Sequence, residues 1–241
     1  MRVIVTRPEL AARRTARRLE SLGHTALLLP LAEPVHDPLA VERSFGWPHA
    51  TIAVTSAEAV RAMQLLGRAL SPHLDTTLFS VGSATSNAAI DAGFRNVVTS
   101  DGGGRELGYA ISDRFTTHGR PSAPLIYIAG EPRSSSFEER LAALGIRHLT
   151  VCGYRMKAVS HHRDHLHSLL VEGRVDAVLF YSRETAERFF SLPVFADNRQ
   201  ILERSIFLCL SPNIANAVPG EYANSTVVAT TPNEDCLLDL L

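Results

Sequence analysis

The sequence contains few cysteines, and their placement argues against a disulfide framework or a cysteine-based metal motif. Only Cys152, Cys209 and Cys236 occur in the 241 residues, and they lie far apart. The first two lie within apolar runs, which is typical of buried thiols. We therefore expect reduced cysteines and no bound metal.

The sequence also lacks an apolar run of the roughly 20 residues that a transmembrane helix needs. Met1 and Arg2 lead straight into a short apolar segment, where a signal peptide would show a different pattern. We therefore expect a cytoplasmic protein that does not bind a membrane.

An excess of one sign of charge is missing as well. The chain has 24 Lys and Arg residues against 25 Asp and Glu residues, a net charge of −1, and so has no general reason to bind nucleic acid. An anionic ligand would have to be held locally. The 45% hydrophobic content is typical of a globular protein, and the length favours two compact domains over one.

The first clear pattern in the chain is a strand that leads directly into a helix. Residues 3–5 form a β-branched apolar run, Thr6 and Arg7 follow, and Pro8 suits the first turn of a helix. Free backbone N–H groups and the helix dipole make such a joint an anion site. The same joint is expected after five further strands, at Thr55 and Ser56, at Ser83 and Thr85, at Gly130 to Arg133, at Ser182, and at Asn213.

Strands that alternate with helices predict parallel sheets with helices on both faces. Two polar segments, 33–38 and 155–160, interrupt the pattern and are candidate linkers. We therefore expect an α/β fold with two doubly wound parallel-sheet domains, flavodoxin-like or Rossmann-like, joined by a two-segment linker with an interdomain cleft. Residues 1–34 and 157–241 would form a discontinuous outer domain, residues 35–156 would form an inserted one, and the two would be circular permutations of one plan.

Two stretches invite a more specific interpretation that their spacing does not support. The run 102–104 is all glycine but lacks the spacing of a phosphate-binding loop, so it predicts a flexible loop. His161 and His165 have a spacing that can bind zinc, and His162 and His167 lie beside them. The run lacks the Glu of a His-Glu-x-x-His motif and a clear third ligand, so we expect solvated histidines.

In parallel α/β sheets, ligands bind beyond the carboxyl ends of the strands. The Ser, Thr and Asn side chains of the six joints fall at those ends. Each one alone is explained by helix capping, because these residues are the best N-caps. Only convergence of several of them on one cleft would indicate a binding site.

An ordered set of residues along nearly the whole chain resembles the uroporphyrinogen-III synthase family. The set comprises Val5-Thr6-Arg7-Pro8, Leu22-Gly23-His24, Val54-Thr55-Ser56-Ala57, Val81-Gly82-Ser83-Ala84-Thr85, Gly130 and Tyr154-Arg155. The resemblance implies a cytoplasmic enzyme without a cofactor, with two α/β domains around a cleft. Such an enzyme dehydrates the linear tetrapyrrole hydroxymethylbilane and closes it to uroporphyrinogen III with ring D inverted. We expect a monomer.

The resemblance also implies how the chemistry proceeds. Loss of the ring A hydroxyl gives an azafulvenium-like cation, which ring D attacks at its substituted carbon to form a spiro intermediate that fragments and recloses. Free bilane closes unaided to the uninverted isomer, so the enzyme mainly has to fix a folded conformation. Several helix N-termini can bind the carboxylates of this polyanion without a net basic protein.

Site residues follow from the same resemblance. Tyr154 matches the family tyrosine proposed to assist departure of the hydroxyl, a role that a phenol can fill as a hydrogen-bond donor or general acid. The residues expected to bind the substrate are Thr6, Arg7, Thr55, Ser56, Ser83, Thr85, Ser182 and Asn213.

The chain departs from the family pattern at two positions. Asn213 stands where relatives commonly have a cleft threonine, and Glu58 stands where bacterial relatives often have Asn. A carboxylate that faces a polyanion is unfavourable, so Glu58 would point away or the site would differ. Two other functions stay open: a non-catalytic two-lobed binder of a polycarboxylate or other small anion, and a nucleotide-binding enzyme, although the chain has no phosphate motif.

Overall fold

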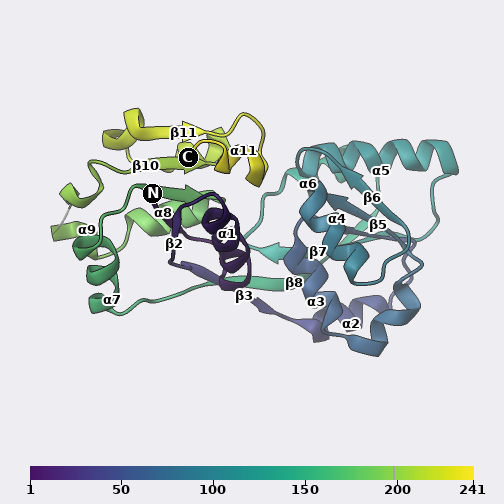
Figure 1. The fold of residues 1–241 in the computed structure, drawn as a ribbon. Helices are drawn as coiled ribbons and strands as arrows, with labels where there is room; N and C mark the ends of the chain where they lie inside the picture. Colours follow the sequence, from purple (N-terminus) through teal and green to yellow (C-terminus); the bar gives the residue numbers. More distant parts are fainter. Residues whose placement is uncertain (198) are drawn as a thin grey trace. The chain divides into compact units, whose positions relative to one another are not determined.

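The computed structural model describes residues 1–197 and 199–241, which divide into two compact units. The outer unit comprises Met1–Glu33 and Lys157–Leu241, and the inserted unit comprises Pro34–Met156. Figure 1 traces the chain through both units by colour. The sequence predicted that the chain passes from one unit to the other after residues 34 and 156. In the structure Pro34 belongs to the inserted unit, so the first passage follows Glu33.

The outer unit is built on a five-stranded sheet with the order β11-β10-β9-β1-β2. All four pairs are parallel. The strands are β1 (Arg2–Val5), β2 (Thr25–Leu28), β9 (Ala177–Phe180), β10 (Ile206–Cys209) and β11 (Thr226–Val228). The helices are α1 (Glu9–Ser21), α7 (Arg163–His167), α8 (Arg183–Phe190), α9 (Val194–Asp197), α10 (Pro212–Ala215) and α11 (Glu234–Leu238). Numbered within the unit, this strand order is the flavodoxin-like 2-1-3-4-5, whose switch point lies between β1 and β9.

The inserted unit is built on a six-stranded sheet with the order β3-β8-β7-β4-β5-β6. The four pairs from β8 to β6 are parallel. The strands are β3 (Ala32–His36), β4 (Thr51–Val54), β5 (Thr77–Val81), β6 (Val97–Ser100), β7 (Leu125–Glu131) and β8 (His148–Ala158). The helices are α2 (Pro38–Phe45), α3 (Ala57–Gln64), α4 (Gly82–Asp91), α5 (Gly104–His118) and α6 (Ser136–Ala143). The chain reverses direction across the sheet between β4 and β7, which is therefore the switch point of this unit.

The two sheets follow one plan with a different starting point in the chain. The outer order β11-β10-β9-β1-β2 corresponds strand by strand to the inserted order β6-β5-β4-β7-β8. In the outer unit β1 and β2 come first in the sequence, whereas their counterparts β7 and β8 come last in the inserted unit. The units are thus circular permutations of each other, and the α/β class with two parallel sheets is confirmed.

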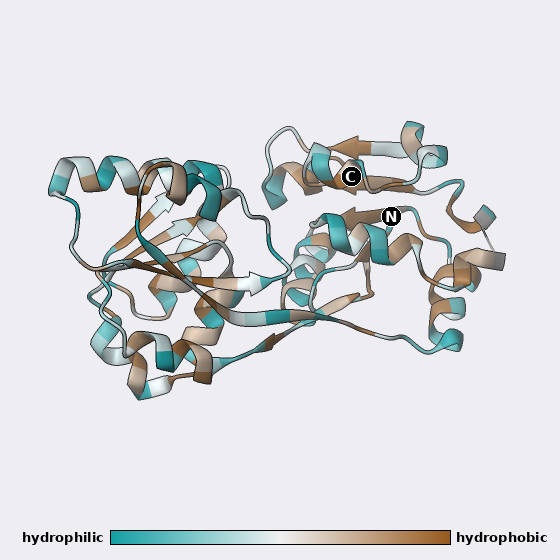
Figure 2. Ribbon diagram, turned by 180° about the vertical axis from the view of Figure 1, so that it is seen from behind, coloured by the Kyte–Doolittle hydropathy of each residue, from teal (hydrophilic) through white to brown (hydrophobic). Residues whose placement is uncertain are grey.

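Each sheet is covered on both faces because alternate residues of its strands point to opposite sides. In β1, Ile4 packs with α8 residues such as Phe189, whereas Val3 and Val5 pack with α1 and α11. The inserted sheet likewise has one core toward α2, α3 and α4 and another toward α5 and α6. Figure 2 shows the result as brown central strands and helices that alternate between brown and teal.

The predicted linkers are strands in the structure. Segment 33–38 contains most of β3, and segment 155–160 contains the end of β8, which is 11 residues long. These strands are neighbours in the inserted sheet, and Asp37 N donates to Gly153 O at 2.8 Å. Proline and charge had suggested irregular structure here, but pairing between the two segments satisfies their backbone groups.

The glycine run at 102–104 spans the end of a loop and the start of α5. Gly102 and Gly103 lie in bends before the helix, Gly103 N–H donates to the Glu106 carboxylate at 2.8 Å, and Gly104 is the first residue of the helix. The predicted loop therefore holds for the first two glycines, and the third belongs to the helix.

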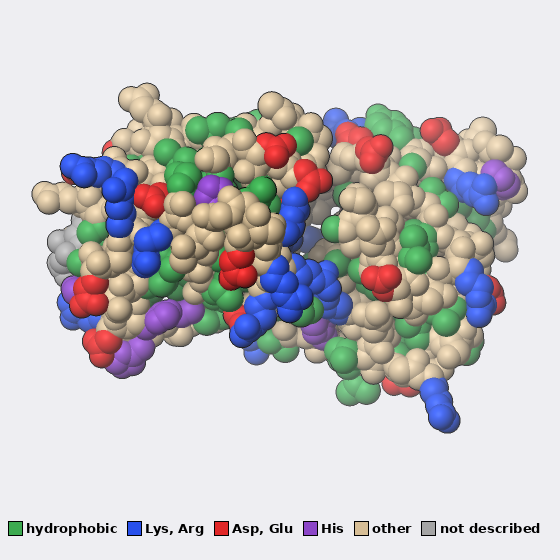
Figure 3. Space-filling model, viewed as in Figure 1, with side chains coloured by type: hydrophobic (Ala, Val, Ile, Leu, Met, Phe, Trp, Pro, Cys, Tyr) green, Lys and Arg blue, Asp and Glu red, His purple; other side chains and the backbone are tan. Residues whose placement is uncertain are grey.

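Three expectations from composition can be compared with the structure. The cysteines are free, but only Cys209 is buried, whereas Cys152 and Cys236 are partly exposed. No helix among the described residues is long and apolar enough to cross a membrane. Figure 3 shows side chains of both charge signs on the visible face of each unit.

Candidate functional site

A cavity of about 220 Å³ lies at the switch point of the inserted unit, at the carboxyl ends of β4, β7 and β8. Most of its lining is polar or small. The lining residues are Thr55, Ser56, Gly104, Tyr127, Gly130, Pro132, Arg133, Ser134, Ser136, Phe137 and Tyr154. Three residues that the sequence predicted for the site, Thr55, Ser56 and Tyr154, are therefore brought together in one hollow.

Ser56 and Thr55 lie where β4 turns into α3. Ser56 is the predicted N-cap, and its side chain accepts a hydrogen bond from Glu58 N at 3.2 Å. The Thr55 hydroxyl is hydrogen-bonded to the Tyr127 hydroxyl at 2.9 Å. Burial raises the pKa of Tyr127, so its phenol stays protonated at neutral pH.

Tyr154 lies in β8 with only 9% of its surface exposed, and its ring packs directly over Gly130. A β-carbon at position 130 would stand 2.3 Å from the ring carbon that carries the hydroxyl, so only glycine leaves room for the phenol. Burial raises the pKa of Tyr154, a hydrogen bond with Ser56 opposes the shift, and the charge of Glu58 adds to it. The Tyr154 phenol is thus held in place and keeps its proton.

The Glu58 carboxylate, which the sequence left unexplained, has two polar partners within the inserted unit. It contacts His36 Nε2 at 3.0 Å and forms an ion pair with Arg61 of the same helix. The side chain is only 14% exposed. Because its charge is paired, Glu58 does not present a free carboxylate to an anionic ligand.

Arg133 lines the cavity, although it was noted only as part of a strand–helix joint and not as a site residue. Its guanidinium forms two parallel hydrogen bonds to Glu138, at 2.9 and 3.1 Å. Hydrogen bonding to Glu138 raises the pKa of Arg133, and the same bond lowers the pKa of Glu138. The signal in the sequence was an arginine directly after a buried strand, the same pattern as Val5-Thr6-Arg7.

Ser83 and Thr85 are not brought to this cavity: among the described residues, its lining includes neither. Both lie inside α4, beyond its first residue Gly82. Ser83 is exposed, and its carbonyl accepts from the Ser86 hydroxyl at 3.0 Å, whereas Thr85 is 6% exposed. Neither residue is the N-cap of α4, which is Val81.

The remaining predicted residues belong to the outer unit. The Thr6 hydroxyl is buried and donates to Leu179 O at 2.8 Å, which ties the end of β1 to β9. Ser182 is the N-cap of α8 and accepts from Thr185 N at 3.2 Å. Asn213 is exposed and lies within the four-residue helix α10, so it does not cap that helix.

Arg7 has intramolecular partners. Its guanidinium contacts Glu234 at 2.7 Å and lies over the Tyr181 ring, 4.1 Å from the ring centre. The sequence did not indicate Glu234, because it is more than 200 positions away in the chain.

The histidine cluster shows no sign of a metal site. His161 Nε2 lies 2.6 Å from Pro30 O, and the rings of His161 and His165 are 5.7 Å apart. Over residues 1–197 and 199–241, no group of three or more His, Cys, Asp or Glu side chains is arranged to hold a metal.

The comparison with family models and the comparison with solved structures both found similar proteins. The model of a family described as uroporphyrinogen-III synthase HemD matches residues 13–239. A search of curated proteins found no match. The structure is similar to uroporphyrinogen-III synthetase from Helicobacter pylori, at 16% identity and a TM-score of 0.69, over 99% of this chain and 96% of that one. It is also similar to a mutant uroporphyrinogen III synthase from Thermus thermophilus, at 20% identity and a TM-score of 0.60, with the same coverage. At these identities the two structures show a shared fold.

Proposed function

Because this chain belongs to the uroporphyrinogen-III synthase family, we propose that the cavity at the switch point of the inserted unit is part of its substrate site. The chain is a cyclising lyase of tetrapyrrole biosynthesis, which converts hydroxymethylbilane into uroporphyrinogen III with inversion of ring D. Its substrate is a small-molecule tetrapyrrole. We propose roles for individual residues of this chain in binding the substrate and in the reaction.

The lining of the cavity suits a carboxylate side chain of the substrate. Ser56 and Ser136 mark the first turns of α3 and α6, where helix dipoles and backbone N–H groups favour an anion. Arg133 is held in position by two hydrogen bonds to Glu138 and has further guanidinium N–H groups that can donate to an anion. A cavity of about 220 Å³ is too small for a whole tetrapyrrole, so we propose that it takes one end of the molecule.

We propose that Tyr154 donates a hydrogen bond or a proton to the hydroxyl that leaves ring A. Its raised pKa keeps the proton on the phenol at neutral pH, so Tyr154 acts as a donor and not as a base. Ser56 and Gly130 beside it fix the orientation of the ring. The paired charge of Glu58 leaves the substrate carboxylates without a free carboxylate to oppose them.

The other assignments rest on the family resemblance. Thr6, Arg7, Ser83, Thr85, Ser182 and Asn213 stay predicted substrate-binding residues. A cytoplasmic location and a monomeric state also stay predictions.

The observation that carries the proposal is that Thr55, Ser56 and Tyr154 line one cavity at the switch point. The test supplies purified protein with hydroxymethylbilane and resolves the uroporphyrin isomers after oxidation. Type III in excess supports the synthase, whereas type I at the rate of unaided closure rejects it. Stabilisation of the protein by uroporphyrinogen without turnover would support the polycarboxylate binder instead.

A matched pair of variants tests the site itself. Ser56→Ala and Asp37→Ala each remove an N-cap in the inserted unit, at a cost of about 1 kcal/mol in stability. Of the two residues, Ser56 lines the cavity together with Tyr154, whereas Asp37 is not among the described lining residues. We expect Ser56→Ala to lower type III formation by about tenfold or more and Asp37→Ala to leave it near that of the parent. Equal losses in both variants would contradict the proposed site.

A further inference from the structure

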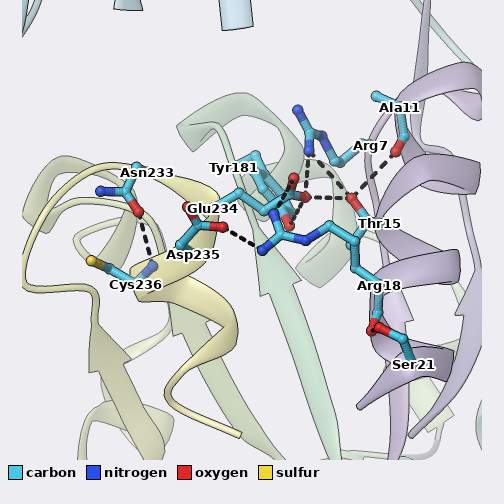
Figure 4. Close-up of polar contacts among 10 residues, drawn as sticks. All are labelled: Arg7, Ala11, Thr15, Arg18, Ser21, Tyr181, Asn233, Glu234, Asp235 and Cys236. Atoms are coloured by element: carbon cyan, nitrogen blue, oxygen red, sulfur yellow. Dashed lines mark hydrogen bonds and ion pairs between the residues drawn. The ribbon is translucent and has the colours of Figure 1, made fainter. Parts of the chain in front are cut away.

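The switch point of the outer unit contains a partly buried cluster of charged and hydroxyl side chains around one carboxylate, that of Glu234. Figure 4 shows how the side chains of this cluster converge. Oε1 of Glu234 accepts from Arg7 at 2.7 Å, from Thr15 at 2.5 Å and from Tyr181 at 2.8 Å. Oε2 accepts from Arg18 at 3.1 Å. A carboxylate with two cations and two hydroxyl donors is in a complete anion site.

Burial opposes the charge of Glu234, but the hydrogen bond from Thr15 and the charge of Arg7 outweigh it, so the pKa of Glu234 is lowered. Burial also raises the pKa of Tyr181, which keeps its hydroxyl as a donor. The Glu234 carboxylate is therefore ionised and fully coordinated at neutral pH.

The correspondence between the two sheets explains where this carboxylate comes from. α11 follows β11 at the edge of the outer sheet, as α5 follows β6 at the edge of the inserted sheet. Glu234 is the first residue of α11, and its counterpart in α5 is Gly104, which lines the cavity of the inserted unit. This position is thus a glycine, Gly104, in the inserted unit, where the cavity is open, and a glutamate, Glu234, in the outer unit.

The cations of the two switch points come from corresponding places as well. Arg7 follows β1, and Arg133 follows the corresponding strand β7. Tyr181 and Ser182 follow β9, as Thr55 and Ser56 follow β4, and both serines are N-caps of eight-residue helices. The outer unit thus has the same kind of site as the inserted unit, but the Glu234 carboxylate lies inside it.

We propose that the switch point of the outer unit is a binding site for a monocarboxylate of about the size of acetate, and that Glu234 of the chain itself occupies it. Arg7 then holds α11 and the end of β1 together through this internal carboxylate. The anchoring of α11 supports a fixed occupant, because Leu237 is fully buried and Leu238 is 3% exposed.

Truncation of Glu234 to Ala tests this proposal, because it removes a group of the size of acetate and leaves the donors in place. We expect Glu234→Ala to lower the thermal unfolding midpoint by roughly 5 °C. Acetate should then raise it in proportion to the logarithm of the acetate concentration above the dissociation constant, with a gain of about 3 °C at ten times that constant. Potassium chloride at equal ionic strength is the control for general salt effects.

Three variants make the test specific. Asp235→Ala removes the neighbouring carboxylate, which is 77% exposed and contacts Arg18 in this cluster, and should gain no more stability from acetate than from chloride. Glu234→Gln fills the same space without a charge and should likewise gain no more from acetate than from chloride. Glu234→Ala combined with Arg7→Met should lose the response because a cation of the site is gone. Binding of ¹³C-labelled acetate, followed by NMR line broadening, gives a second readout that does not depend on the unfolding midpoint.

The proposal is overturned if acetate and chloride act alike on Glu234→Ala, or if the response persists in Glu234→Gln or in the double variant. These readouts do not use hydroxymethylbilane, so a failure here is distinct from a failure of the proposed substrate site.

Discussion

Replacement of Gly130 by Ala should displace the Tyr154 phenol by about 1 Å, and this displacement is the most direct test of the role of the tyrosine. An added β-carbon would lie 2.3 Å from the ring and 2.4 Å from its hydroxyl oxygen, against the 3.4 Å at which ordinary contact begins. Gly130 is not among the glycines with positive φ, so alanine causes no backbone strain of its own. The three atoms nearest to the added β-carbon all belong to Tyr154, so the main effect of Gly130→Ala is on the tyrosine ring.

Two magnitudes follow from this displacement. Overpacking at a filled site costs about 1–3 kcal/mol, which urea unfolding measures. A misplacement of about 1 Å in a catalytic group can lower turnover by about a hundredfold. We expect Gly130→Ala to form type III product roughly a hundredfold more slowly, as measured by isomer analysis after a timed reaction with hydroxymethylbilane.

A double-mutant cycle with Tyr154→Ala separates the ring from the rest of the protein. In the Tyr154→Ala background the three closest contacts of the added methyl group are gone, so Gly130→Ala should cost less than about 0.5 kcal/mol there. An equal cost in both backgrounds would show that the clash is not with the tyrosine. Turnover that stays within a factor of about two of the parent in Gly130→Ala, despite a measured loss of stability, would refute the reasoning about Tyr154.

The other predictions concern the phenol proton and the Arg133–Glu138 pair. Tyr154→Phe should lower turnover by about tenfold or more if the phenol proton is used. The control Tyr109→Phe changes an exposed position on α5 and should leave turnover unchanged. An unchanged rate in Tyr154→Phe dismisses a catalytic role. Hydrogen bonding to Arg133 lowers the pKa of Glu138, so the pair stabilises the protein above the unfolded pKa of about 4.3 and loses that effect as pH falls through the folded value. The stability difference between the parent and Arg133→Met should therefore be constant above about pH 5 and shrink below about pH 4 in urea titrations. Arg155→Met breaks the more exposed pair with Glu131 and should leave the stability nearly unchanged at every pH.

Much of the fold was accessible from the sequence because local signals agree with the tertiary structure. The β-branched run at residues 3–5 is fully buried in β1, and the serines at positions 56 and 182 are N-caps, as their places after apolar runs indicated. The permuted relation of the two sheets also followed from the order of strands alone. These features depend on residues that are near one another in the chain.

The parts that could not be predicted depend on distant neighbours. Segments 33–38 and 155–160 have few local strand signals and become strands because each pairs within the sheet of the inserted unit. Gly130 is distinguished by a tyrosine 24 positions later, and Arg7 by a glutamate more than 200 positions later. The predicted list thus included Thr55, Ser56 and Tyr154, which line the cavity, but not Glu234, whose partners lie far away in the chain. Arg133 was left out although it follows a buried strand as Arg7 does.

The pairing of β3 with β8 has a consequence for how the inserted unit joins the outer chain. The strand that enters the inserted unit, β3, and the strand that leaves it, β8, are adjacent in one sheet. The inserted unit therefore interrupts the outer chain at a single place. Beside this place, Val159 N donates to Leu31 O at 3.1 Å, so the ends of the outer chain also meet there. Insertion or removal of the whole inserted segment would therefore break no strand pairing in the outer sheet.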